Sequence, residues 1–301
     1  MNGRRGAATR APRFVRAVPL AALLPLAVVA ACGPGPALAE PATLRYEGSF
    51  GYASGSYLFD QIVTSWTLTN GVALQHARWS ARVSVPVHLQ SSVVTNTGAG
   101  ALPGGGPLQG DVASQGRGRS AAPGVHRPGH VGVPDSIADE RRVVAGDPIL
   151  SLSATPLAGG TGSFSLGLAA KAPLASEEDY GTGAWDWGGT AGLLLAPGGG
   201  TMLSADVSYW ILGDLDSLAF RDPFTGSLTL AKSVGPDLLA ALTISAGTTA
   251  ISGYDGPVTA GLLFTRTRNG RSLSAGVTVG FTETAADAVA TISWSLPLTR
   301  R

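Results

Sequence analysis

The chain has 301 residues, a formal net charge of +1 and a single cysteine. One cysteine excludes an internal disulfide, and a nearly neutral chain gives no electrostatic reason to expect a nucleic-acid partner. Glycine occurs 42 times and lysine only at positions 171 and 232, a composition that favours β-structure over charged helices.

Residues 1–39 form a predicted signal peptide. Five arginines precede an apolar run over residues 17–31, and Ala37-Leu38-Ala39 is typical of a cleavage site. The run is shorter than the roughly 20 apolar residues that a membrane-spanning helix needs. Removal of residues 1–39 leaves a mature chain over residues 40–301 with a formal charge of −4, since the signal peptide holds five positive charges and no acidic residue.

Cys32 allows a second interpretation of this N-terminus. The sequence Val29-Ala30-Ala31-Cys32 resembles a lipobox, in which the cysteine becomes the lipidated first residue of the mature protein. Cleavage after Ala39 discards Cys32, whereas lipidation anchors the chain through it. Both processing routes stand as hypotheses.

Period-two alternation recurs along the mature chain and predicts β-strands. In the first example, Leu44, Tyr46 and Phe50 share one face, and Arg45 and Glu47 share the other. The predicted strands cover residues 43–52, 58–69, 77–90, 147–156, 162–172, 183–196, 201–212, 225–233, 239–250, 257–267, 271–284 and 286–296.

Connection lengths separate a membrane barrel from a soluble sandwich, because strands alternate in both architectures. Short turns at 157–161, 197–200 and 268–270 fall on one side, and the three longest links, at 91–146, 173–182 and 213–224, fall on the other. This parity is typical of outer-membrane barrels. We expect an all-β, antiparallel up-and-down transmembrane β-barrel of about 12 strands, placed in the bacterial outer membrane with its lipid as a partner.

Residues 91–146 form the one low-complexity segment, with 12 glycines, 5 prolines and no Phe, Trp or Tyr. Such a segment cannot bury enough apolar surface to fold alone. We interpret it as a long surface loop of the barrel; a loop folded into the lumen as a plug is the alternative.

Two features test the assignment of a lipid-facing side. Lys232 and Arg266 share its parity, so we expect both near strand ends, where long side chains can reach the interface. Aromatic residues should also gather toward strand ends as interfacial girdles. The predicted girdle residues are Tyr46, Tyr52, Trp185, Trp187, Tyr209, Trp210 and Trp294.

Polar residues on the other parity are candidates for the lumen wall. Their opposite charges allow two interpretations, because they can line a wet channel or pair and close a narrow interior. The candidate lumen-lining residues are Arg45, Glu47, Gln61, Arg82, His88, Lys171, Asp186 and Asp206.

The sequence holds no recognisable catalytic motif, and we expect neither an enzyme nor a cofactor. His88 shares its face with Ser84, so a Ser–His pair is conceivable, but lumen hydrogen bonding explains both residues equally. His126 and His130 are four apart, yet Pro128-Gly129 prevents the helix that would align them as metal ligands. No metal site is expected.

A short series of motifs resembles a known family. Gly146-Asp147-Pro148 opens a predicted strand, followed by Lys171-Ala172-Pro173, Gly181-Thr182-Gly183 and Asp186-Trp187. Their order resembles the outer-membrane family labelled as meta-pathway phenol-degradation proteins, which are described as transporter-like. The resemblance covers residues 45–210 loosely and 146–187 best, and it implies a barrel with these motifs at strand ends and in a loop.

Three functions remain open at this point. The leading one is a transporter-like, porin-like channel for small aromatic or otherwise hydrophobic compounds, a substrate class implied by the resemblance alone. The second is a non-transporting structural or surface-binding barrel. The third is a periplasmic β-sandwich lipoprotein anchored through Cys32. The sequence does not determine an oligomeric state.

Overall fold

The structure is a computed structural model that describes residues 42–55, 63–90, 142–174, 185–212, 222–248 and 255–298. No helix in these ranges is long and apolar enough to cross a membrane. The strands are β1 (Thr43–Gly55), β2 (Val63–Gln75), β3 (Trp79–Gln90), β4 (Arg142–Ala145), β5 (Ile149–Gly159), β6 (Gly162–Lys171), β7 (Asp186–Gly198), β8 (Thr201–Ile211), β9 (Phe224–Ser233), β10 (Leu238–Gly247), β11 (Val258–Arg268), β12 (Arg271–Gly280) and β13 (Ala288–Pro297).

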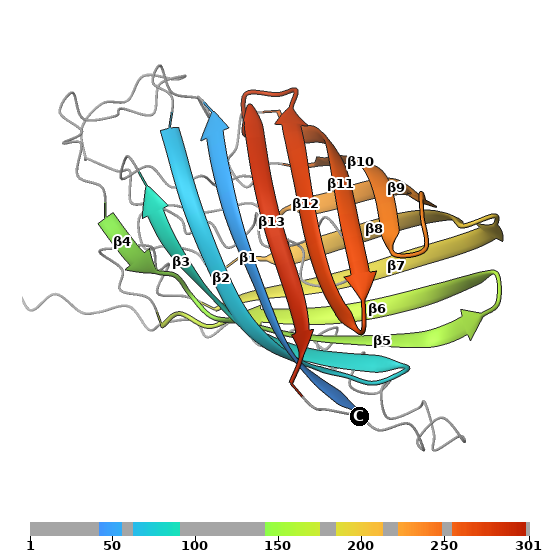
Figure 1. The fold of residues 1–301 in the computed structure, drawn as a ribbon. Coiled ribbons are helices and arrows are strands. Elements are labelled where there is room, and N and C mark those ends of the chain that lie inside the picture. The colour runs from blue at the N-terminus through green and yellow to red at the C-terminus, as the bar shows by residue number, and fades with distance from the viewer. Residues whose placement is uncertain are drawn as a thin grey trace, which may run out of the picture.

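The strands form one closed antiparallel ring (Figure 1). Strands adjacent in sequence pair with each other except β4 and β5, and β1 pairs with β13 from Arg45 opposite Pro297 to Ser54 opposite Ala288. β4 and β5 share one position beside β3, so the ring has 12 strand positions. The predicted 12-strand up-and-down barrel is confirmed, and the β-sandwich alternative is wrong because a closed ring has no second sheet and no free edge.

The division of one position between β4 and β5 follows from a proline. Pro86 lies inside β3, and its carbonyl accepts a hydrogen bond from the Gly146 backbone N–H at 2.8 Å. Because Pro86 has no N–H, it cannot donate a second hydrogen bond to the facing strand, and the ladder is interrupted at Gly146-Asp147-Pro148. The predicted loop 91–146 therefore extends too far, since β4 occupies its last residues; residues 91–141 lie outside the described ranges.

The two ends of the barrel differ in their connections. Turns of two to four residues join strands at one end, called the turn end below, and Asn269 and Gly270 there adopt positive φ values of 53° and 72°. The strand ends joined by longer links all lie at the opposite end, called the link end. This arrangement confirms the predicted alternation of short turns with longer connections.

The second strand was predicted too early in the chain. Residues 58–69 were expected, whereas β2 runs from Val63 to Gln75. Asn70-Gly71 is a dipeptide that favours turns, but here it lies inside β2. Asn70 is held on the outer face, where its Oδ1 accepts a hydrogen bond from the Tyr46 hydroxyl at 2.6 Å.

The two faces of the wall differ in size and polarity of side chains. Outward residues such as Val83, Leu228 and Phe264 are large, apolar and about half exposed, at 50%, 61% and 51%. Inward residues are mostly serine, threonine, glycine and alanine, and many are buried. An apolar outside and a polar inside are the pattern of a barrel that faces lipid.

Glycines on both faces make room for tryptophans on the next strand. Gly48 lies under Trp294 on the outer face, and Gly188 lies under Trp210 on the inner face. A Cβ at Gly188 would lie 2.7 Å from Cε2 of Trp210. The prediction that Trp210 belongs to an outer girdle is therefore wrong: its neighbour Tyr209 faces outward, and alternation turns Trp210 inward.

Both lipid-facing cations lie close to strand ends, as expected. Lys232 is the last but one residue of β9, and its Nζ donates to the Gly199 carbonyl of a turn at 2.7 Å. Arg266 lies two residues from the end of β11, opposite Leu238, the first residue of β10. The predicted signal peptide with Cys32, as well as Gln61, His126 and His130, lies outside the described residues.

Candidate functional site

The inner face of β8 to β12 is lined by hydroxyl groups that bond to one another. Because facing residues of adjacent strands share a face, serines and threonines meet in pairs across the ladder. The pairs are Ser208–Thr225 at 2.9 Å, Thr229–Thr243 at 2.7 Å, Ser245–Thr259 at 2.7 Å and Thr265–Ser274 at 2.9 Å. The hydroxyl pairs make much of this side of the interior polar, and Asp206 on β8 adds a charged side chain to it.

Three charged residues form a cluster toward the turn end, which we call the turn-end cluster: Arg45, Glu47 and Arg82. Arg82 forms an ion pair with Glu47, with Nε 2.6 Å from Oε2. Arg45 donates from Nε to the Ser295 hydroxyl at 2.8 Å, and that hydroxyl donates to Glu47 at 3.2 Å. The Arg82 side chain is 33% exposed and that of Glu47 is 12% exposed, so this cluster contacts solvent through Arg82.

Small residues on β2 make the turn-end ion pair possible. Glu47 belongs to β1 and Arg82 to β3, so the side chains must meet across β2. At these positions β2 presents only Gly71, opposite Glu47, and Ala73, opposite Arg82. A larger inward residue there would separate the two charged groups.

A second cluster, the link-end cluster, consists of Asp147, Lys171 and Asp186. Lys171 ends β6 and Asp186 begins β7 directly opposite, with Nζ 2.6 Å from the Asp186 carboxylate. Asp147 approaches the same Nζ at 3.6 Å from the interruption between β4 and β5. The side chains of Lys171, Asp186 and Asp147 are only 14%, 5% and 2% exposed, so this cluster is buried. Asp147 was not among the predicted lumen residues, although it lies in the Gly-Asp-Pro motif.

His88 and Trp210 are buried in the same half of the barrel. His88 is fully buried, and its Nδ1 lies 3.1 Å from the Thr67 hydroxyl. The conceivable pair with Ser84 does not form, because residues four apart on one strand are about 13 Å apart. Trp210 packs against Ala169 with Ile149 and Leu212 beside them, and a second apolar cluster of Ala231, Ala241 and Leu263 with Met202 and Leu239 lies on the inner face toward the turn end. No cluster suited to a metal ion occurs among the described residues.

Asp206 lies near the middle of β8 and away from both clusters. Its carboxylate lies over Gly192 on β7, where a Cβ would come within 2.5 Å of Oδ1. Within the described ranges, no cation forms an ion pair with Asp206, whereas Glu47 and Asp186 each have one. The charged side chains described on the inner face are Arg45, Arg82, Lys171, Glu47, Asp147, Asp186 and Asp206.

Known proteins resemble this chain in structure and not in sequence. No protein-family model matches the sequence, and no curated protein matches it. An outer membrane channel from Pseudomonas putida F1 superposes with a TM-score of 0.57 at 9% identity, over 86% of this chain and 96% of that chain. Two weaker similarities follow. The NanC porin has a TM-score of 0.49 at 6% identity, over 85% of this chain and 100% of that chain. The CymD monoaromatic hydrocarbon channel has a TM-score of 0.46 at 9% identity, over 87% of this chain and 90% of that chain. The first similarity supports the barrel fold, and the weaker two add nothing to it.

Proposed function

We propose that this protein is an outer-membrane channel that admits small compounds through the interior of its barrel. The observation that carries the proposal is the contrast between the two faces of one closed wall. The outside is apolar around the ring, while the inside carries hydroxyl pairs, two charge clusters and Asp206. A wall of this kind suits a wet path through lipid. The similar Pseudomonas protein is itself an outer membrane channel.

The compounds that we propose as substrates are small and aromatic or otherwise hydrophobic. The sequence resemblance to transporter-like phenol-degradation proteins first suggested this class. The cluster of Trp210, Ile149 and Leu212 adds physical support, because it places an aromatic side chain among apolar groups of the inner face.

The ion current through such a channel should be small. A barrel with 12 strand positions is narrow compared with porins of 16 to 18 strands. Inward side chains on β1 to β3 are packed closely, with His88 at 0%, Ser49 at 2% and Thr69 at 3% exposure. Little room is left for a continuous water column on that side of the interior.

Single-channel recording of the purified protein in planar bilayers tests the proposal. We expect small current steps that fall when phenol is added, because a bound ring displaces water and ions. Cyclohexanol at equal concentration serves as the control for non-specific effects on the bilayer, and Trp210→Leu should weaken the block by phenol. Current steps as large as those of a general porin would contradict the narrow interior.

A non-transporting barrel is the second candidate, and the burial of the link-end cluster favours it. If the charged groups serve only to close the interior, the parent protein gives no current steps. Removing one of them could then create a conductance that the parent lacks. The same recordings, repeated on Asp186→Asn, distinguish this outcome from a channel.

A further inference from the structure

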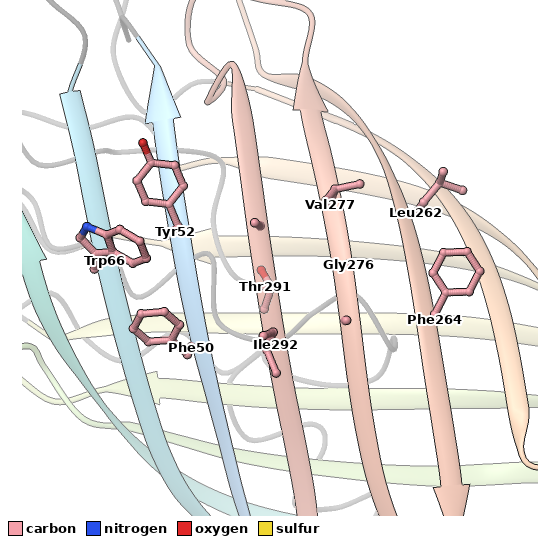
Figure 2. Close-up of a pocket in the computed structure, with 11 residues that line it drawn as sticks. Phe50, Tyr52, Trp66, Leu262, Phe264, Gly276, Val277, Thr291 and Ile292 are labelled. Atoms are coloured by element: carbon pink, nitrogen blue, oxygen red, sulfur yellow. The ribbon is translucent and has the colours of Figure 1, made fainter.

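A groove of about 500 Å³ lies on the outer surface of the barrel, across β1, β2, β11, β12 and β13 (Figure 2). Two neighbouring cross-strand rows of outward residues build it. One row runs Phe50, Ile292, Ala275, Phe264, and the other runs Trp66, Tyr52, Ala290, Val277, Leu262.

The groove exists because small residues fall between large ones in both rows. Ala275 separates Ile292 from Phe264, and Ala290 separates Tyr52 from Val277. One wall is an aromatic cluster in which Trp66 lies 5.4 Å from Phe50 and 4.5 Å from Tyr52 between ring centroids. The opposite wall is Leu262 and Phe264 on β11 (Figure 2). The lining contains no charged residue.

Three arginines lie at the turn end of the strands that form this groove. Arg266 continues the outward parity of Leu262 and Phe264 on β11, and Arg268 faces Arg271 across the β11–β12 turn. All three are exposed, and within the described residues none forms an ion pair. Asp237, in the β9–β10 turn, is joined to this strand through its backbone carbonyl, which accepts a hydrogen bond from the Thr267 N–H at 2.8 Å. The turns at 159–162 and 198–201 carry no charge at all.

We propose that the groove and these arginines together bind one anionic phospholipid of the leaflet at the turn end. An acyl chain lies along Ala275 and Ala290 between the two walls, and the phosphate lies against Arg266, Arg268 and Arg271. From Arg266 to Leu262 the strand rises about 13 Å, which is within the reach of one extended acyl chain. The proposal goes beyond the proposed function, because it concerns the outer face and does not depend on passage through the interior.

Charge favours lipid over a second copy of this chain. Two barrels in one membrane have the same orientation, so an interface at the groove would bring two sets of three arginines to the same level. Like charges placed together oppose such an interface, whereas an anionic headgroup compensates them. The groove also lies within the apolar outer surface that hydrocarbon must cover.

Native mass spectrometry of the full protein in a non-ionic detergent tests the proposal with two probes. Dioleoyl phosphatidylglycerol is anionic, and dioleoyl phosphatidylcholine has the same chains with a zwitterionic headgroup. We expect the parent to retain about tenfold more of the anionic lipid, given three basic side chains at the headgroup level. Retention of both lipids at equal levels would overturn the role of the arginines.

Two sets of variants with matched controls separate the groove from the charges. Ala275→Leu with Ala290→Leu fills the groove and should lower retention of both lipids about tenfold. This factor corresponds to the loss of about a dozen contacts between carbon atoms of the acyl chain and the groove. Ala205→Leu, on the outer face of β8, is its control and should retain lipid as the parent does. Arg266→Gln with Arg268→Gln and Arg271→Gln should remove only the anionic preference, whereas Lys232→Gln at the same end should keep it.

The same spectra report the outcomes that contradict the proposal. Unchanged retention in the filled-groove variant, or equal loss in Ala205→Leu, would show that lipid does not occupy the groove. A dimer in the parent that disappears when the groove is filled would show that a second copy occupies it. Comparison of boiled and unheated samples on a denaturing gel confirms that each variant is folded, and none of these results depends on conductance.

Discussion

The link-end and turn-end clusters contain similar groups in different surroundings. Asp147 and Asp186 are almost completely shielded from solvent and Lys171 is 14% exposed, whereas at the opposite end Arg82 is 33% exposed beside Glu47 at 12%. Removing a partner from a buried ion pair leaves an uncompensated charge, whereas a solvent-exposed pair is screened and weak. The buried cluster also joins the interruption between β4 and β5 to β6 and β7. The comparison indicates that the link-end cluster stabilises the fold and that the turn-end cluster is the more accessible to solvent.

The largest effect is expected from Lys171→Met. This change leaves Asp147 and Asp186 buried together without a cation, and should lower the free energy of unfolding by about 3–5 kcal/mol. Arg82→Met at the turn end is the comparison and should cost less, because the Ser295 hydroxyl still donates to the Glu47 carboxylate and accepts from Arg45. Urea unfolding in detergent, followed by tryptophan fluorescence, measures both. Equal losses in the two variants would remove the distinction between the clusters.

A smaller effect is expected beside the link-end cluster, where Trp210 covers Gly188. Gly188→Ala places a methyl group 2.7 Å from the indole and should cost about 1–3 kcal/mol, because the ring must move within a packed interior. Gly189→Ala is a matched control, since no atom lies within 4 Å of the Cβ position there. The same unfolding measurement compares them. If both variants unfold like the parent, Trp210 is not packed as the structure shows.

The smallest effects are expected on ion selectivity, where carboxylates with and without a cationic partner should differ. Asp206→Asn removes an inward carboxylate that has no cationic partner in the described part of the wall, so the reversal potential in a salt gradient should shift toward anions. Asp186→Asn should shift it less, because the charge of Asp186 is already compensated by Lys171. Arg45→Gln with Arg82→Gln should shift it toward cations. A larger shift from Asp186→Asn than from Asp206→Asn would contradict the assignment.

Much of the fold could be predicted because alternation and connection length are local properties of the sequence. The number of strand positions, the parity of turns and the inward placement of Arg45, Lys171 and Asp206 follow from them. Lys232 and Arg266 were expected near strand ends for the same reason. Local propensity misled the prediction at Asn70-Gly71, where pairing with β1 and β3 keeps a turn-forming dipeptide inside β2.

Features that depend on register between strands could not be predicted. The outer groove arises only when Ala275 and Ala290 are placed side by side with Phe50 and Phe264, and no single strand shows this. The ion pair of Glu47 with Arg82 likewise depends on Gly71 lying between them. Trp210 was placed outside because aromatic residues near strand ends suggested a girdle, although strict alternation from Tyr209 would have turned it inward.

Access of water to the interior is the central claim, and cysteine labelling in lipid bilayers tests it most directly. In a Cys32→Ser background, Ser227→Cys lies on the inner face opposite Asp206, and Leu228→Cys lies next to it on the lipid-facing side. A small cationic methanethiosulfonate reagent should react rapidly at position 227 and more slowly when Asp206 is also changed to Asn. It should react slowly at position 228, which hydrocarbon shields. If position 227 reacts as slowly as position 228, the interior is closed and the channel is excluded.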